Sequence, residues 1–291
     1  MTAIVKYCDN KQSMKIKYLL PVLAFAVLLS ACGAKKATTT QTAAQNVGTK
    51  LLVNELALDQ RPFTVLVPHP TNKLFTFVAI NADKAKTASL DLEYQSGDLL
   101  KGAMATLETP ISNPYIKAIV LGSCSTGGKC TFDTDLKSGT MKLKLNFGDQ
   151  AVTHVLKGDF VFITGQNNLP DGKVTFTPSK ATSKDNLIML NSFGLPKTNS
   201  KEILLYPVVI SSATGNNIVG NLTINQPGVT SAAIYDGQNY QSLTYTDKNG
   251  VLTFNLNNKP WSMNATIVRD DQQGTTESVT LYLLGPILLY K

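Results

Sequence analysis

Apolar and polar residues alternate with a period of two along several short stretches of the chain. The clearest stretches are 88–94, 141–147 and 252–256, in which every second residue is apolar. Successive side chains of a strand point to opposite faces, so each stretch is predicted to be a strand with one buried face. We predict further strands over 63–67, 74–80, 115–121, 130–136, 160–164, 203–210, 218–224 and 279–284.

Turn-forming residues separate these strands. Glycine occurs with aspartate or asparagine at 148–150, 213–217 and 247–250, and each group is followed by an apolar residue. Beyond the first 32 residues, no window keeps apolar residues at helical spacing for three turns. An all-β fold of packed sheets is therefore predicted, because a sheet with one apolar face buries it against another layer.

A polar stretch at 165–172, with two glycines and a proline, divides the strand-rich region into near-equal parts. Such stretches are typical of domain boundaries. We predict one β-sandwich domain at 51–165 and a second at 173–291. A break at 196–200, which contains a proline, is the alternative boundary.

The longest apolar run lies near the amino terminus. Lys15 and Lys17 precede it, which is the order of a secretory signal, and the run is shorter than the roughly 20 residues of a membrane-spanning helix. We predict that residues 1–31 are a signal peptide. Translation is expected to start at Met14, where a basic segment of normal length begins, or at Met1 with a longer one.

The end of this run resembles the lipobox of bacterial lipoproteins. Leu29, Ser30 and Ala31 precede Cys32, and in that family a peptidase cuts before the cysteine after its sulfur has been joined to diacylglycerol. The resemblance implies a membrane anchor at Cys32, where each buried methylene of acyl chains such as palmitate contributes about 0.8 kcal/mol. Gly33 replaces the aspartate that marks inner-membrane retention in the family, which favours the bacterial outer membrane.

Residues 32–50 contain almost no large aliphatic side chains and are predicted to be a disordered tether. Beyond it, Cys124 and Cys130 are the remaining cysteines, and an exported chain meets oxidising conditions. We predict a disulfide between them, which contributes about 2 kcal/mol in the chain-entropy account. A redox pair prefers two intervening residues and a zinc site needs four ligands, so both roles fit less well.

The first half of the chain also resembles bacterial immunoglobulin-like repeats of the ASPM/SPD-2/hydin type. Those repeats have an aromatic-alternating strand that ends in asparagine, then a bend and an aliphatic strand, as at 75–81 and 88–92. They often carry a cysteine, a glycine-containing loop and a second cysteine followed by threonine and an aromatic residue, as at 124–132. The resemblance implies an immunoglobulin-like sandwich and no particular activity.

Residue types that carry chemistry are sparse. His69, between two prolines, and His154, on an alternating strand, are expected to be structural. Asp133 and Asp135 are predicted to share one face of a strand, as a paired-carboxylate or calcium site requires, although a solvated edge explains them equally well. We expect no catalytic residue, metal site or cofactor.

A loop at 235–246 mixes Tyr235, Tyr240 and Tyr245 with amide side chains. Such a loop could contact a glycan or a peptide, because tyrosine offers contact area at low entropic cost. The formal net charge of +7 comes partly from lysines in the signal, and arginine occurs only at Arg61 and Arg269, so nucleic-acid binding is not expected.

These observations together predict a non-enzymatic, lipid-anchored protein of the cell envelope that binds or scaffolds an envelope protein or glycan. The first alternative is a surface-exposed adhesin or host-contact lipoprotein, and the second, less favoured one is an envelope enzyme.

Overall fold

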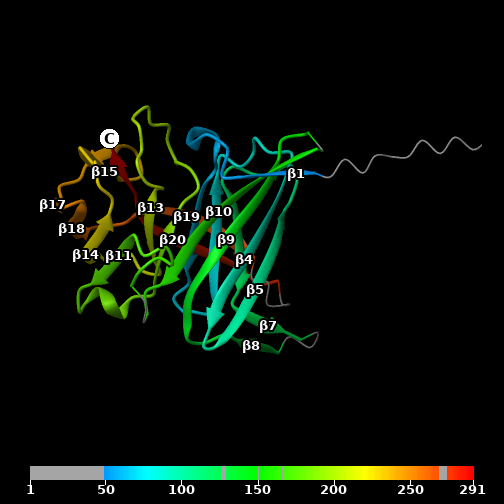
Figure 1. The fold of residues 1–291 in the computed structure, drawn as a ribbon. Coiled ribbons are helices and arrows are strands. Elements are labelled where there is room, and N and C mark those ends of the chain that lie inside the picture. Colours follow the sequence, from blue (N-terminus) through cyan, green and yellow to red (C-terminus); the bar gives the residue numbers. More distant parts are fainter. Residues whose placement is uncertain (1–48, 126–128, 150, 165–166, 269–273) are drawn as a thin grey trace, which may run out of the picture. The chain divides into compact units, whose positions relative to one another are not determined.

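The computed structural model describes residues 49–125, 129–149, 151–164, 167–268 and 274–291 (Figure 1). Within these ranges the chain is almost entirely β-strand, with two single turns of 3-10 helix at Leu58–Gln60 and Thr182–Lys184. The predicted all-β class is therefore confirmed.

The predicted signal peptide, the lipobox and Cys32 lie outside the described residues. In the described part, no helix has both the length and the apolar character that spanning a membrane requires.

A large antiparallel sheet forms the middle of the fold. Its strands follow the order β16-β15-β20-β13-β12-β10-β9-β4-β5, with β1 paired parallel to β10, and β19 paired to β20. The strands are β1 (Lys50–Val53), β4 (Thr87–Ser96), β5 (Leu99–Leu107), β9 (Leu136–Asn146), β10 (Val152–Phe162), β12 (Leu187–Asn191), β13 (Val208–Ser212), β15 (Ser231–Tyr235), β16 (Tyr240–Ser242), β19 (Trp261–Val268) and β20 (Thr276–Tyr290).

Smaller sheets pack against this one. One has the order β2-β3-β6, from β2 (Phe63–Pro68), β3 (Leu74–Ile80) and β6 (Tyr115–Val120). Another has the order β11-β14-β18-β17, from β11 (Val174–Pro178), β14 (Ile218–Asn225), β18 (Val251–Asn258) and β17 (Thr246–Lys248). The strands β7 (Gly122–Cys124) and β8 (Cys130–Phe132) form a short hairpin and pair only with each other.

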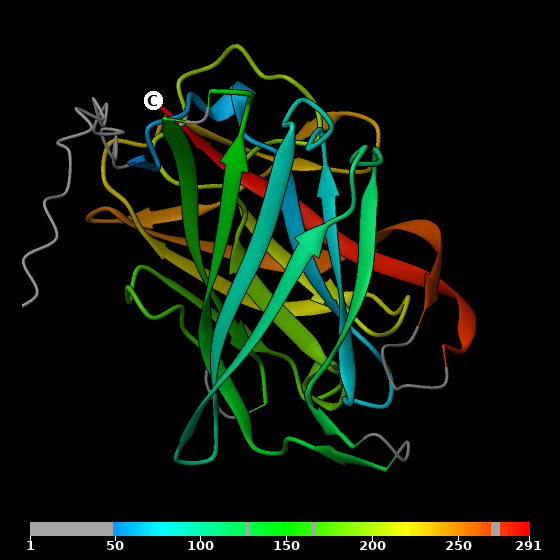
Figure 2. The ribbon, with the colours of Figure 1, turned by 90° about the vertical axis from the view of Figure 1, so that its right-hand side faces the viewer.

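The central strands are apolar on both faces because a separate core lies on each side of them. Along β10, Phe160 and Phe162 belong to the core beneath β2-β3-β6, whereas Val161, and Ile163 just after the strand, belong to the core beneath β11-β14-β18. The same division alternates along β12 and β13. The strand β20, red in Figure 2, supplies Leu283 to the first core and Leu284 to the second.

The predicted boundary at 165–172 does not separate two packed units. The sheet continues from β10 to β12 across this stretch, and the described residues form one compact unit. Leu169 within the stretch is fully buried in the second core. The chain therefore has two cores in one three-layer body, with the large sheet shared between them, instead of sandwich domains at 51–165 and 173–291.

Each predicted strand coincides at least in part with an observed one, but several differ in their bounds. The prediction over 160–164 covers only the end of β10, and that over 279–284 covers only part of β20. The prediction over 130–136 is divided, because β8 ends at Phe132 and Asp135 has a left-handed backbone with φ of 51° before β9 begins. The prediction over 203–210 is reduced to β13, which begins at Val208. The predicted tether is described only at its last two residues, of which Lys50 pairs with Val152 as the first residue of β1.

Candidate functional site

A surface groove lies where three connections meet at one end of the long strands. It has a volume of about 780 Å³ and lies between the turn that joins β2 to β3, the end of β4 and the link from β8 to β9. The link runs from the end of the short hairpin to the start of β9. Its polar side chains therefore lie over the edge of the sheet. The groove is lined by Thr71, Asn72, Lys73, Gln95, Phe132, Asp133, Thr134, Asp135, Leu136, Lys137 and Thr164.

Asp133 and Asp135 both line the groove, but they do not form a carboxylate pair. The Tyr94 hydroxyl donates a hydrogen bond of 2.7 Å to Asp133, whose other oxygen lies 3.3 Å from the Lys101 ammonium. Asp135 instead pairs with Lys137 at 3.6 Å. The predicted common strand face is wrong, since Asp135 lies outside a strand with positive φ. Each carboxylate is already neutralised by its own lysine.

The Asp133 network is partly desolvated. Burial, followed by the hydrogen bond and the negative charge of Asp133, raises the pKa of Tyr94 well above its usual value of 10.0. The tyrosine therefore keeps its proton and acts as a fixed donor at physiological pH. Among the described residues, no group of three or more His, Cys, Asp or Glu side chains is placed to hold a metal ion.

A disulfide holds the hairpin that forms one wall of the groove. The sulfurs of Cys124 and Cys130 are 2.05 Å apart, so the predicted pairing is present. Two residues after Cys130, the Phe132 ring lines the groove, and the Lys73 ammonium lies 4.7 Å from its centroid. The hairpin and the turn between β2 and β3 therefore make contact across the groove.

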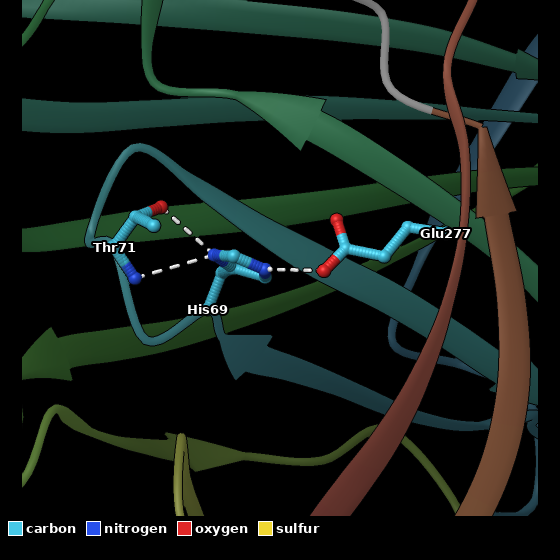
Figure 3. A network of polar contacts seen from close by, with 3 residues as sticks. All are labelled: His69, Thr71 and Glu277. Atoms are coloured by element: carbon cyan, nitrogen blue, oxygen red, sulfur yellow. Dashed lines mark hydrogen bonds and ion pairs between the residues drawn. The ribbon is translucent and has the colours of Figure 1, made fainter.

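His69 lies beside the same turn and bridges it to β20 (Figure 3). The Thr71 backbone N–H donates to Nδ1 at 3.2 Å, and the Thr71 hydroxyl lies 2.8 Å from the same atom. Because Nδ1 accepts, Nε2 carries the proton and faces Glu277 Oε1 at 3.4 Å. The ring is 8% exposed, and both of its nitrogens are occupied by the protein itself. This geometry fits the structural role predicted for His69.

His154 lies at the opposite end of the long strands. Its ring packs edge-on against Phe147 at 5.5 Å, and its Nδ1 is buried with no hydrogen-bond partner among the described residues. Neither histidine lines the groove.

The predicted tyrosine loop folds as a hairpin, and its three tyrosines do not form one surface. Tyr235 and Tyr240 pack together with ring centroids 5.2 Å apart. Tyr245 packs elsewhere, against Phe254 of the second core. The structure adds Trp261, whose ring lies 5.7 Å from Tyr235 at a right angle. Apolar residues alternate with polar ones from Trp261 to Ile267, a signal from which the strand β19 could be predicted, but only the pairing of β19 with β20 reveals where Trp261 lies.

Protein-family models, curated proteins and solved structures were compared with the chain. None of them matches it. The choice of function therefore depends on the side chains themselves.

The groove offers both hydrogen-bond donors and hydrogen-bond acceptors. Its two lysines and two aspartates leave little net charge. Thr71, Asn72, Gln95 and Thr134 contribute neutral polar groups, and Phe132 contributes an apolar face. Such a surface suits a polar ligand or a polar segment of a partner, since specificity comes from a few placed polar groups around an apolar contact.

Proposed function

We propose that the protein is a non-enzymatic, lipid-anchored binding or scaffolding module of the bacterial cell envelope, held at the outer membrane through Cys32. The amino-terminal pattern supports the anchor, because a basic segment, an apolar run, Leu29, Ser30, Ala31 and the cysteine occur in the order of a lipoprotein signal. The groove at the end of the long strands supports the binding role.

The position of the groove is the observation that carries this proposal. Lys50, where the chain joins the folded body, pairs with Val152 beside the last residues of β9. The groove residues Leu136 and Lys137 are the first residues of the same strand. At about 3.3 Å per residue, the two ends of β9 are roughly 33 Å apart. The groove therefore lies at the end of β9 that is far from Lys50, which supports its role as a surface for a partner.

A crosslinking experiment tests the groove. A photoreactive amino acid would replace Thr134 in the groove, and a matched chain would carry it at Thr140, which is on the same strand system but outside the groove. We expect a specific adduct in intact envelopes from position 134 only. The same adducts from both positions, or none from position 134, would contradict a binding role for the groove.

Mass spectrometry of the native polypeptide tests the anchor. We expect an amino-terminal Cys32 with a diacylglycerol thioether, and a Cys32→Ala variant that no longer partitions into membranes. An unmodified amino terminus at Met1 or Met14, with Cys32 as a free thiol, would overturn the proposal.

Protease treatment of intact cells separates the two possible faces of the outer membrane. We expect the protein to be protected, as a periplasmic location requires. Its loss from intact cells would instead support a surface-exposed adhesin.

A further inference from the structure

We propose that a second pocket, between the hairpin of β15 and β16 and the start of β19, binds a saccharide ring against the indole of Trp261. This goes beyond the groove proposed above, since it involves other residues. The pocket has a volume of about 570 Å³, within the range of small-ligand sites. It is lined by Asp236, Gly237, Gln238, Trp261, Ser262 and Met263.

The indole of Trp261 is held in one orientation. Its Nε1–H donates a 2.7 Å hydrogen bond to the Gly285 carbonyl, and the half-buried side chain also packs against the first core, so its remaining apolar surface is the part that lines the pocket. Tyr235 packs edge-on against the ring at 89°, and the Tyr235 hydroxyl donates to the Gly237 carbonyl at 3.0 Å. A fixed aromatic plane lowers the entropic cost of binding, because the ring does not have to be ordered by the ligand.

Gly237 keeps the space beside the indole open. Its backbone has φ of +98°, and a Cβ built at this position would lie 3.0 Å from Cβ of Trp261 and 3.3 Å from Cγ. Any side chain at position 237 would therefore press against the root of the indole and fill part of the pocket. The glycine is required here both by its left-handed backbone and by the close approach of the ring.

The loop that carries Gly237 and Gln238 is preorganised. One carboxylate oxygen of Asp236 accepts hydrogen bonds from the backbone N–H groups of Gln238 (2.8 Å) and Asn239 (2.7 Å), and the other accepts from the Gln241 amide (2.9 Å). From the neighbouring connection, the Lys197 ammonium donates to the Gln238 carbonyl at 3.1 Å. Hydrogen bonds at both its N–H and its carbonyl thus fix the backbone of Gln238, whose exposed side chain lies at the pocket.

The chemistry of this lining favours a sugar. A pyranose has an apolar C–H face, which suits an aromatic plane, and a rim of hydroxyl groups, which suits the Gln238 amide and the Ser262 hydroxyl. The Asp236 carboxylate disfavours an anion. A quaternary ammonium ion is usually enclosed by several aromatic rings, whereas Trp261 is the only aromatic residue among those that line this pocket.

The test uses the intrinsic fluorescence of Trp261, which is the single tryptophan of the chain and lines this pocket. The full-length protein would be titrated with trisaccharides of glucose, galactose and N-acetylglucosamine, and separately with choline. We expect a saturable change with at least one saccharide, at millimolar concentration or below, and no change with choline.

Two variants and a matched control make the result specific. Gly237→Ala and Gln238→Ala are each expected to weaken the saccharide response by roughly tenfold. Gly228→Ala is the control, because Gly228 also has positive φ (79°) but a Cβ there would meet nothing within 4 Å. Gln238 is exposed, so its variant leaves folding intact.

The proposal is overturned if none of the three trisaccharides changes the fluorescence, if choline gives the same response, or if Gly237→Ala binds as tightly as Gly228→Ala. Failure here is distinguishable from failure of the proposed function, because the adducts at Thr134 and the lipid on Cys32 are measured at other positions.

Discussion

The neighbours of Gly139 leave no room for a larger side chain at this position. A Cβ at this position in β9 would lie 2.3 Å from the Glu93 carbonyl oxygen of β4 and 2.5 Å from the ring of Phe160. A glycine usually weakens a strand, but here it lets the phenylalanine ring cover the backbone, an arrangement used to support glycines in sheets. The ring in turn fills the first core.

Gly139→Ala is therefore expected to lower the free energy of unfolding by about 1–3 kcal/mol, as overpacking does. Gly102→Ala is the control, because Gly102 lies on β5 in the same sheet and its nearest contact is an ordinary 3.4 Å. Urea denaturation followed by circular dichroism would measure both. Equal losses in the two variants would show that the contact with Phe160 does not limit this position.

Asp236 gives a second prediction at this scale. Hydrogen bonds from Asn239, Gln241 and Gln238 lower the pKa of Asp236 from 3.8 to about 2. A carboxyl group with a depressed pKa stabilises its surroundings above its ordinary pKa, and this stabilisation is lost as the pH falls towards the lowered value. The loop should therefore stay intact at pH 4 and release the Trp261 environment as the pH approaches about 2.

The pH dependence of Trp261 fluorescence would measure this transition. The control is Asp236→Asn, whose amide oxygen can still accept the backbone N–H groups but does not titrate. An identical acid transition in this variant would assign the change to other carboxyl groups.

Among the elements, the disulfide-closed hairpin depends least on the rest of the fold. Strands β7 and β8 have three residues each and pair only with each other, and an isolated two-stranded hairpin is marginal in water. The backbone N–H of Asp133 donates to the Leu121 carbonyl at 2.9 Å, which ties the hairpin to β6 at its base. The disulfide is therefore expected to keep the outer part of the hairpin closed.

A variant with both Cys124→Ser and Cys130→Ser should open this hairpin locally. We expect faster amide hydrogen exchange in Gly122–Cys124 and Cys130–Phe132, with the exchange of β9 and β10 unchanged, because these strands have their own partners. Mass-spectrometric hydrogen exchange would measure both regions. Protection of the hairpin equal to that of the parent protein would show that the disulfide is dispensable.

The burial of each strand's two faces explains which strands the sequence predicts. Strands β4, β9 and β18 have one face in a core and one in water, so their composition alternates and they are predicted well. Strand β12 is buried on both faces and strand β5 carries glycine and alanines, so neither shows the period of two. The predicted disulfide depends on cysteine count alone, whereas the approach of Trp261 to Gly237 depends on pairings between distant segments.

For the whole molecule, the shared sheet makes the two cores interdependent. The polar stretch at 165–172 has the composition of a linker, yet the strands on either side of it belong to one body, β10 to the shared sheet and β11 to the outer layer that packs on it. The composition of a segment indicates whether it is exposed to solvent, but not the order of the strands in a sheet. The sequence therefore predicts two domains. The central strands β10, β12 and β13 lose one of their two packed faces if either outer layer is removed.

The folded body should therefore unfold in one transition. We expect coincident denaturation curves from Trp261 fluorescence and from far-ultraviolet circular dichroism, which reports on all the sheets. A fragment that ends at residue 164 should not fold, because the second face of β10 would be exposed. Two separated transitions, or a folded fragment, would show that the layers are independent.

The place of β20 in both cores has a consequence for biogenesis. If the chain is exported as proposed, it passes the secretion channel amino terminus first, and the residues of β20 emerge after those of its partners β13, β15 and β19. Until they arrive, apolar faces in both halves stay uncovered, and such surfaces aggregate readily. Under the proposed export, these faces would therefore have to be shielded until β20 joins the sheet.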